Sequence, residues 1–170
     1  ILPVPGSDIV TQTARAAAAA KPTTPTGFPL PDAEALMAAV RAGLAGVTEP
    51  KPARAVIVRL LLAARTEGSA AFEGAFRATP RSARALITAQ AALTDVLVRV
   101  AFEAARLLHP LSNPTEAERI AVLGVGGYGR AEMAPFSDVD LLFLTPWKTT
   151  PWAESVIEDV LYILWDLKLK

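Results

Sequence analysis

The 170-residue sequence contains no cysteine and only one histidine. The lack of cysteine excludes disulfides, thiolate metal sites and cysteine nucleophiles, and the single histidine excludes a metal site built from several imidazoles. The lack of cysteine also fits a reducing compartment, and we expect a cytoplasmic protein.

Net charge and long apolar runs are also missing. Basic and acidic side chains balance at 17 each, so no overall field favours nucleic acid or an anionic membrane. The apolar stretches 55–58 and 60–64 are separated by Arg59 and fall short of the ~20 residues that a spanning helix needs. We therefore expect neither nucleic acid nor a membrane as a partner.

Charge is unevenly distributed along the chain. Residues 121–170 carry 7 acidic and 4 basic side chains, whereas residues 1–120 carry 10 acidic and 13 basic ones. Cations would therefore gather near the last part of the chain.

Helical periodicity dominates the first two thirds of the sequence. Residues 1–31 contain six prolines and form the exception, an extended arm, because this composition buries too little apolar area to offset ordering. A helical segment over 32–110 follows, with a possible break at Gly68. Its apolar side chains recur at helical spacing in three stretches, residues 32–45, 51–79 and 81–109.

The pattern changes after residue 110. Thr115 and Glu118 have the spacing of a capping box, and two short β-branched or apolar runs, 120–126 and 138–144, predict buried strands. A final helix has an apolar stripe, with Glu154, Glu158 and Asp159 on the opposite side. The fold class is therefore α+β, mostly helical, with a second unit over 111–170.

The sequence GGYGRAEMAPFSDVDLLFL, residues 126–144, contains the chemically informative groups. Asp138 and Asp140 stand two positions apart at the start of a predicted strand, so both carboxylates leave the same face of it. Two such groups can hold hard cations that clamp phosphates during in-line displacement. Val139 and Leu141 then face the core.

Gly126 and Gly127 form the other half of the pattern. Without β-carbons their N–H groups can approach phosphate oxygens, and a helix that begins there adds a favourable dipole. Arg130 could contact the same phosphates, although pairing with Glu132 is equally open. Each feature alone is common, but two acids that enter an apolar strand repel each other unless a cation is near.

These residues resemble a known family. The Gly-Gly and Asp-x-Asp arrangement resembles the polymerase-β-like nucleotidyltransferase superfamily. Its fuller form, Gly-Gly-Tyr-Gly-Arg-x-Glu-x-x-Pro-x-Ser-Asp-x-Asp-Leu-Leu, resembles the bacterial PII uridylyltransferase and uridylyl-removing enzymes. The run LYILWDL at 161–167 is similar to the helix that follows in that family, so the close match covers residues 120–170.

The resemblance implies both a fold and a function. In that family the first domain transfers UMP from UTP to a tyrosine of the PII signalling protein in nitrogen regulation, with Mg²⁺ or Mn²⁺, and other domains sense glutamine. Residues 111–170 would then begin a polymerase-β-like core with a mixed sheet and flanking helices. The residues implied are Asp138 and Asp140 for catalysis and metal binding, and Gly126, Gly127, Arg130 and Ser137 for nucleotide binding.

The sequence departs from the family pattern in two places. Lys168 stands where the family usually has glycine, which leaves the turn after the last helix open. The superfamily also needs a third carboxylate on a later strand, whereas the remaining acids of this region fall in the predicted helix. We expect the third ligand beyond Lys170, and the 170 residues alone to be inactive.

Two other functions remain open. An adenylyltransferase of the type that modifies glutamine synthetase has a similar glycine segment, but the Tyr-Gly-Arg sequence fits the uridylyl enzymes better. A non-catalytic helical binding module would use the Asp pair only structurally. His109 is interpreted as a packing or capping residue, and Trp147, Trp152 and Trp165 as packing residues in preference to base-stacking ones.

Overall fold

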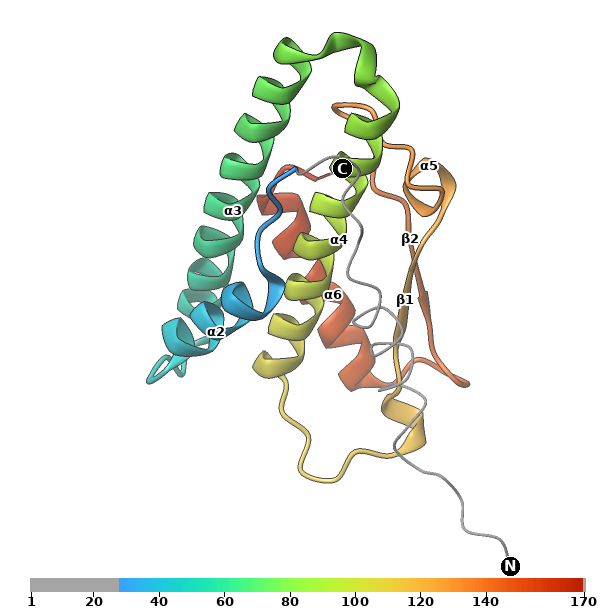
Figure 1. The fold of residues 1–170 in the computed structure, drawn as a ribbon. Coiled ribbons are helices and arrows are strands. Elements are labelled where there is room, and N and C mark those ends of the chain that lie inside the picture. The colour runs from blue at the N-terminus through green and yellow to red at the C-terminus, as the bar shows by residue number, and fades with distance from the viewer. Residues whose placement is uncertain (1–27, 170) are drawn as a thin grey trace, which may run out of the picture.

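The computed structural model describes residues 28–169, so most of the arm predicted for 1–31 lies outside the described residues. The long helices lie together, with a small two-stranded sheet to one side (Figure 1). The helices are α2 (Ala33–Leu44), α3 (Pro50–Ala78), α4 (Ala83–Leu108) and α6 (Pro151–Asp166). The shorter elements are η1 (Pro80–Ser82), η2 (Glu116–Glu118), β1 (Ala121–Gly124), α5 (Gly126–Gly129) and β2 (Leu141–Leu144).

Local signals fix the helix ends close to their predicted positions. Asp32 caps α2 by accepting the N–H groups of Glu34 and Ala35 at 2.9 and 3.4 Å, which supplies acceptors that the first turn of a helix lacks. The predicted capping box is also confirmed, because the Thr115 N–H donates to Glu118 Oε2 at 2.8 Å.

The predicted break at Gly68 is wrong, because α3 runs unbroken for 29 residues. Gly68 is buried, and a β-carbon there would lie 2.7 Å from the side chain of Leu93 on α4. The glycine therefore serves the close approach of two helices and does not interrupt one.

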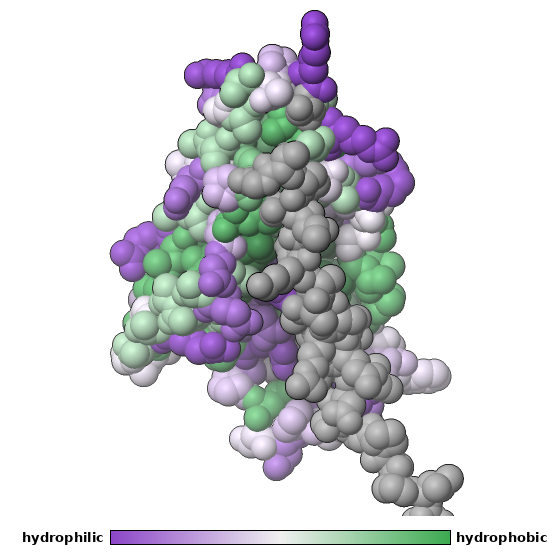
Figure 2. Space-filling model, in the orientation of Figure 1, coloured by the Kyte–Doolittle hydropathy of each residue, from purple (hydrophilic) through white to green (hydrophobic). Residues whose placement is uncertain are grey.

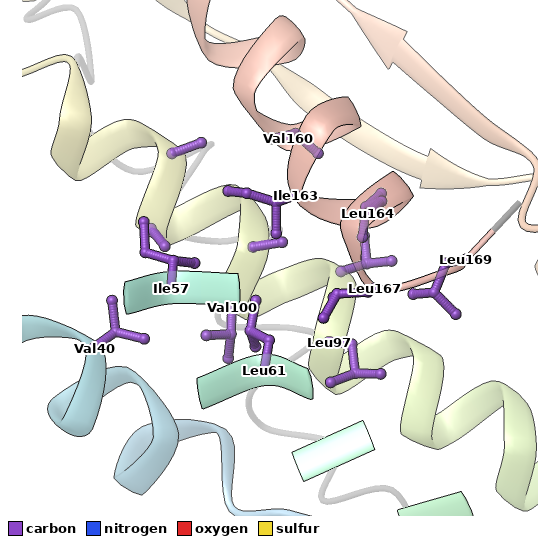
Figure 3. Packing of buried hydrophobic residues seen from close by; sticks show 14 of the residues in the cluster. Val40, Ile57, Leu61, Leu97, Val100, Val160, Ile163, Leu164, Leu167 and Leu169 are labelled. Atoms are coloured by element: carbon purple, nitrogen blue, oxygen red, sulfur yellow. The ribbon is translucent and has the colours of Figure 1, made fainter. Parts of the chain in front are cut away.

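The core lies where the four long helices meet. Figure 3 shows its side chains pointing toward one another from α2, α3, α4 and α6. Its largest fully buried apolar members are Val40, Ile57, Leu61, Leu93, Leu97, Val100, Val156, Val160, Ile163 and Leu167. Because α6 follows the sheet in sequence, the predicted segments 32–110 and 111–170 share this single cluster.

Helix α4 is the only helix among residues 28–169 that is long and apolar enough, by composition, to span a membrane. Its apolar residues pack on α2, α3 and α6, and eleven of its 26 residues are buried. This burial accounts for the composition of the helix without a membrane.

The sheet has two antiparallel strands, with Ala121 paired to Leu144 and Gly124 to Leu141. Both strands are shorter than the predicted 120–126 and 138–144, because the chain leaves the ladder after Gly124. One face packs on the core through Val122 and Phe143. The outer face is exposed and apolar, and Figure 2 shows apolar surface where Figure 1 places the strands. The α+β class is thus confirmed, whereas the mixed sheet stays a prediction.

The prediction that Asp159 lies on the polar side of the last helix is wrong. Its side chain is largely buried and joins three elements, because Arg54 Nη2 lies 2.5 Å from Oδ1 and His109 Nε2 lies 2.7 Å from Oδ2. The Trp152 indole N–H also donates to the His109 carbonyl at 2.7 Å. An acid can occupy this apolar stripe because both its oxygens are bound.

The turn after α6 forms without glycine. Lys168 takes the left-handed conformation, with φ 58°, in which glycine is favoured. Its N–H donates to Trp165 O at 2.9 Å, and the Leu169 N–H donates to Leu164 O at 3.0 Å. These two bonds form a Schellman motif, and Leu164 and Leu169 are both buried in the core cluster. The departure at Lys168 is therefore accommodated by backbone strain.

Candidate active site

The residues between the two strands form a tight loop, here called the glycine loop (residues 125–133). The Val125 N–H donates to Asp140 O at 3.0 Å, and the chain then turns at Gly126, whose φ is 60°. The single helical turn α5 follows, closed by the Gly129 N–H on Val125 O at 2.8 Å. A β-carbon at Gly129 would overlap the carbonyl oxygen of Gly124, so the loop needs glycine at both ends of this turn.

The carboxylate of Asp140 lies against this loop. A β-carbon at Gly126 would overlap Asp140 Oδ2, so any other residue there would require the carboxylate to shift. The structure therefore brings together the glycine turn and one of the two predicted acidic residues. The first N–H groups of a helical turn lack acceptors within it, so those of Gly126 and Gly127 are available beside the carboxylate.

Asp138 and Asp140 lie just before β2, not within it as predicted. Exposure still alternates along the chain from Ser137 to Leu144, with both aspartates on the exposed face and Val139 and Leu141 partly buried against the core. This alternation supports a shared face for the two acids. Neither aspartate forms an ion pair with another described residue.

Arg130 and Ser137 stand at the rim of the loop. Arg130 Nε lies 3.1 Å from Glu132 Oε2, and both side chains are more than half exposed. The structure thus contains the Glu132 pairing, and such exposed pairs are weak enough to exchange for a stronger anion. Ser137 is half-buried, and its N–H donates to Ala134 O at 3.1 Å in the turn before Asp138.

Tyr128 anchors the loop to α4. Its side chain is 7% exposed and packs with Ala91 and Met133. Its hydroxyl donates to Asp95 Oδ1 at 2.7 Å. Burial, followed by the charge of Asp95, raises the pKa of the Tyr128 phenol, which stays protonated and donates at all ordinary pH values. The residue Asp95 is exposed overall, but partial burial of its carboxyl group raises the pKa of Asp95.

The sequence is similar to a set of known proteins that share one name. The chain is 64% identical over 142 residues to the bifunctional uridylyltransferase/uridylyl-removing enzyme of Cereibacter sphaeroides. It is 51% identical over 140 residues to the enzyme of that name from Ruegeria pomeroyi, and 41% identical over 150 residues to that from Erythrobacter litoralis. The chain is homologous to one segment of these enzymes.

The segment is a small part of each relative. The matches cover 82%, 82% and 88% of this chain but only 15%, 15% and 16% of the three enzymes. No family model matches the chain, and no solved structure matches it. The resemblance to uridylyltransferase and uridylyl-removing enzymes is therefore confirmed, for this segment.

The two aspartates have the chemistry of hard-cation ligands. Asp138 and Asp140 offer exposed carboxylate oxygens, which Mg²⁺ and Mn²⁺ prefer over nitrogen or sulfur. Within residues 28–169 no group of three metal-ligating side chains comes together. In this part of the chain the two aspartates therefore do not form a complete metal site by themselves.

Sequence reasoning missed Asp95 and misjudged Trp147. Asp95 looks like an ordinary polar position of a helix, and only the fold brings it to Tyr128, 33 positions away. Trp147 is 85% exposed and so is not a packing residue, whereas Trp165 packs edge-on against Tyr162, as predicted. His109 is a structural residue, as predicted, through its contact with Asp159.

Proposed function

We propose that this chain is part of a metal-dependent nucleotidyltransferase that transfers UMP from UTP to a tyrosine of a PII-type signalling protein in the cytoplasm. The names of the relatives support uridylyl transfer as the reaction. Within this proposal the chain supplies the phosphate-binding loop and two carboxylates, and domains outside it sense glutamine.

One observation carries the proposal. The Asp140 carboxylate lies against Gly126, where any β-carbon would overlap it. This contact sets an acidic ligand beside N–H groups that can receive phosphate oxygens. A carboxylate and a triphosphate at this distance repel each other, and a cation bound between them would neutralise that repulsion.

Each residue has a distinct part in this reaction. Asp138 and Asp140 would hold Mg²⁺ or Mn²⁺, which neutralises phosphate charge and lowers the pKa of a bound hydroxyl. Gly126 and Gly127 would bind the triphosphate through their N–H groups. Arg130 would leave Glu132 and bind a phosphate group, which can accept two of its N–H groups and is the stronger partner. Ser137 would donate its hydroxyl to the nucleotide.

The decisive test uses a chimera in which this chain replaces the matched segment of the Cereibacter sphaeroides enzyme. We expect Mg²⁺-dependent transfer of labelled UMP from UTP to a PII acceptor. Asp138→Asn and Asp140→Asn should each reduce transfer at least about a hundredfold, because the metal loses a charged ligand. Glu154→Gln, which removes an exposed acid of α6, is the matched control and should retain full transfer.

Two results would overturn the proposal. A preference for ATP over UTP would favour an adenylyltransferase, and unchanged metal binding in the Asp138→Asn, Asp140→Asn double variant would favour a binding module. We further propose that the 170 residues alone are inactive because the carboxylate set is incomplete. UMP transfer by that fragment would contradict this part.

A further inference from the structure

One face of the N-terminal half of α4 contacts the glycine loop. Ile87, Ala91 and Asp95 are spaced four residues apart, so they form a single stripe on the helix. The Met133 N–H donates to the Ile87 carbonyl at 3.4 Å, Ala91 packs on Tyr128 and Met133, and Asp95 accepts the Tyr128 hydroxyl. Figure 1 shows α5 beside the N-terminal half of α4.

Tyr128 transmits this contact into the loop. It stands between Gly127 and Gly129, so its backbone is part of the turn. Its ring lies against β1, because a β-carbon at Gly124 would be 3.0 Å from the ring carbons. The hydroxyl at the far end of the ring is held by Asp95 at 2.7 Å. Because the ring is buried and its hydroxyl is bound, a change in the ring's orientation would disturb the turn.

The contact is chemically selective. Asp95 is the hydrogen-bond acceptor of the buried Tyr128 hydroxyl, and loss of that acceptor would leave a buried donor unsatisfied. The flanking glycines contribute only backbone hydrogen bonds within the loop, such as Gly129 N–H to Val125 O and Glu132 N–H to Gly127 O. Tyr128 is the residue of this turn whose side chain connects the loop to α4.

We propose that Asp95 is a positioning residue for nucleotide binding, which acts by holding the glycine loop against α4 through the Tyr128 hydroxyl. This inference rests on the proposed function for its nucleotide part. It assigns the helical segment an indirect role in nucleotide binding, because a residue of α4 sets where the phosphate-binding N–H groups lie.

The test compares Asp95→Ala, Asp95→Asn and Tyr128→Phe in the chimera. Asp95→Ala and Tyr128→Phe should each weaken UTP binding about tenfold, the loss of a hydrogen bond to a charged acceptor. The double variant should be no weaker than either single one, because both remove the same bond. Asp95→Asn should rescue binding, since the amide oxygen can still accept the phenol proton.

A second readout separates this inference from the proposed function. Hydrogen exchange of peptides that span residues 125–133, measured by mass spectrometry, should become about tenfold faster in Asp95→Ala and Tyr128→Phe. Glu103→Gln removes another α4 carboxylate, one paired with Arg106, and should change neither readout.

The outcomes are distinct. Unchanged exchange and unchanged UTP affinity in both variants would overturn the positioning role. Faster exchange with unchanged UTP affinity would overturn its link to nucleotide binding. If the parent chimera fails to bind UTP, the proposed function fails, and the exchange data still decide whether Asp95 holds the loop.

Discussion

The helical core and the glycine loop are stabilised in opposite ways. Core side chains such as Ile57, Leu97 and Ile163 are at most 1% exposed and contact one another from four helices. The region of the loop instead contains glycines, exposed charges and two strained residues, Ala131 and Phe136, with φ of 55° and 67°. Its anchors are few, and the Tyr128–Asp95 bond is the most specific of them.

This difference separates two tasks within one small structure. A close-packed apolar core stabilises the fold but offers no polar group to a ligand. Small and polar residues instead leave backbone N–H groups and carboxylates accessible. Strained backbone in the loop region is sustained by the packed helices beside it. Substitutions in the core should therefore change stability, and substitutions in the loop should change binding more than stability.

The largest effect on stability is expected from Leu97→Ala. This side chain is 1% exposed in the centre of the core, and the cavity left behind should lower the free energy of unfolding by about 3 kcal/mol. Urea denaturation measures the change. Leu107→Ala on the same helix is the control, because Leu107 is 43% exposed and should cost below about 1 kcal/mol. Equal losses would contradict the assignment of the core.

Asp159→Ala should have the next largest effect. Its removal leaves Arg54 and His109 without their common partner, and we expect a loss of about 2 kcal/mol because Arg54 keeps some contact with solvent. The neighbouring exposed residue gives the control, since Glu158→Ala removes the same charge from the same turn. If both variants unfold at the same urea concentration, the three-residue junction contributes nothing.

Gly126→Ala sharpens the comparison at the loop. The left-handed φ alone should cost about 1 kcal/mol, and the overlap with Asp140 should add to that cost. Gly46→Ala isolates the first part, because Gly46 has φ 77° and a β-carbon there would meet no atom within 4 Å. Thermal unfolding should therefore show Gly126→Ala as the less stable variant, and the reverse order would mean that the Asp140 carboxylate moves aside without cost.

Lys168→Gly should stabilise the chain. Glycine adopts the left-handed φ of the Schellman turn without the strain that a β-carbon brings, a gain of about 1 kcal/mol. Lys168→Ala retains the β-carbon and removes only the charge, so it should show no gain. A lower melting temperature for the glycine variant would indicate that the lysine side chain itself stabilises the turn.

Two acids should give small pH effects of opposite sign. Burial raises the pKa of Asp95 above 3.8, so its contribution to stability is greatest at low pH and is lost as pH rises through the folded value. Hydrogen bonds with Thr115 lower the pKa of Glu118 below 4.5, so its contribution is present above that value and lost as pH falls through the folded one.

Urea denaturation at about pH 3 and about pH 7 tests both signs. Relative to the parent, Asp95→Asn should gain stability as pH rises, whereas Glu118→Gln should lose it. Shifts in the same direction for both variants would contradict one of the two environments.

Much of the fold follows from local signals in the sequence. Asp32, Pro80 and the Thr115–Glu118 box mark helix boundaries through interactions within a few residues, and such signals need no knowledge of the tertiary structure. The Asp-x-Asp and glycine pattern likewise predicts that a carboxylate and a tight turn meet.

The errors at Asp159 and Gly68 concern contacts between distant segments. Asp159 finds its partners 105 and 50 positions away, and a helical wheel has no access to such pairs. Gly68 alone suggests a break in the helix, yet glycine is needed there because Leu93 of another helix lies too close for a β-carbon. The early end of the strands depends on the left-handed turn at Gly126, which the sequence allowed but did not require.

The stripe on α4 also makes binding and folding interdependent. Because the same helix packs in the core and grips the loop, a nucleotide that immobilises the loop should raise the melting temperature of the whole assembly of helices. A core substitution should weaken nucleotide binding only as far as it also loosens the contact between α4 and the loop. Core residues that pack on that part of α4 would then influence nucleotide affinity without touching a phosphate.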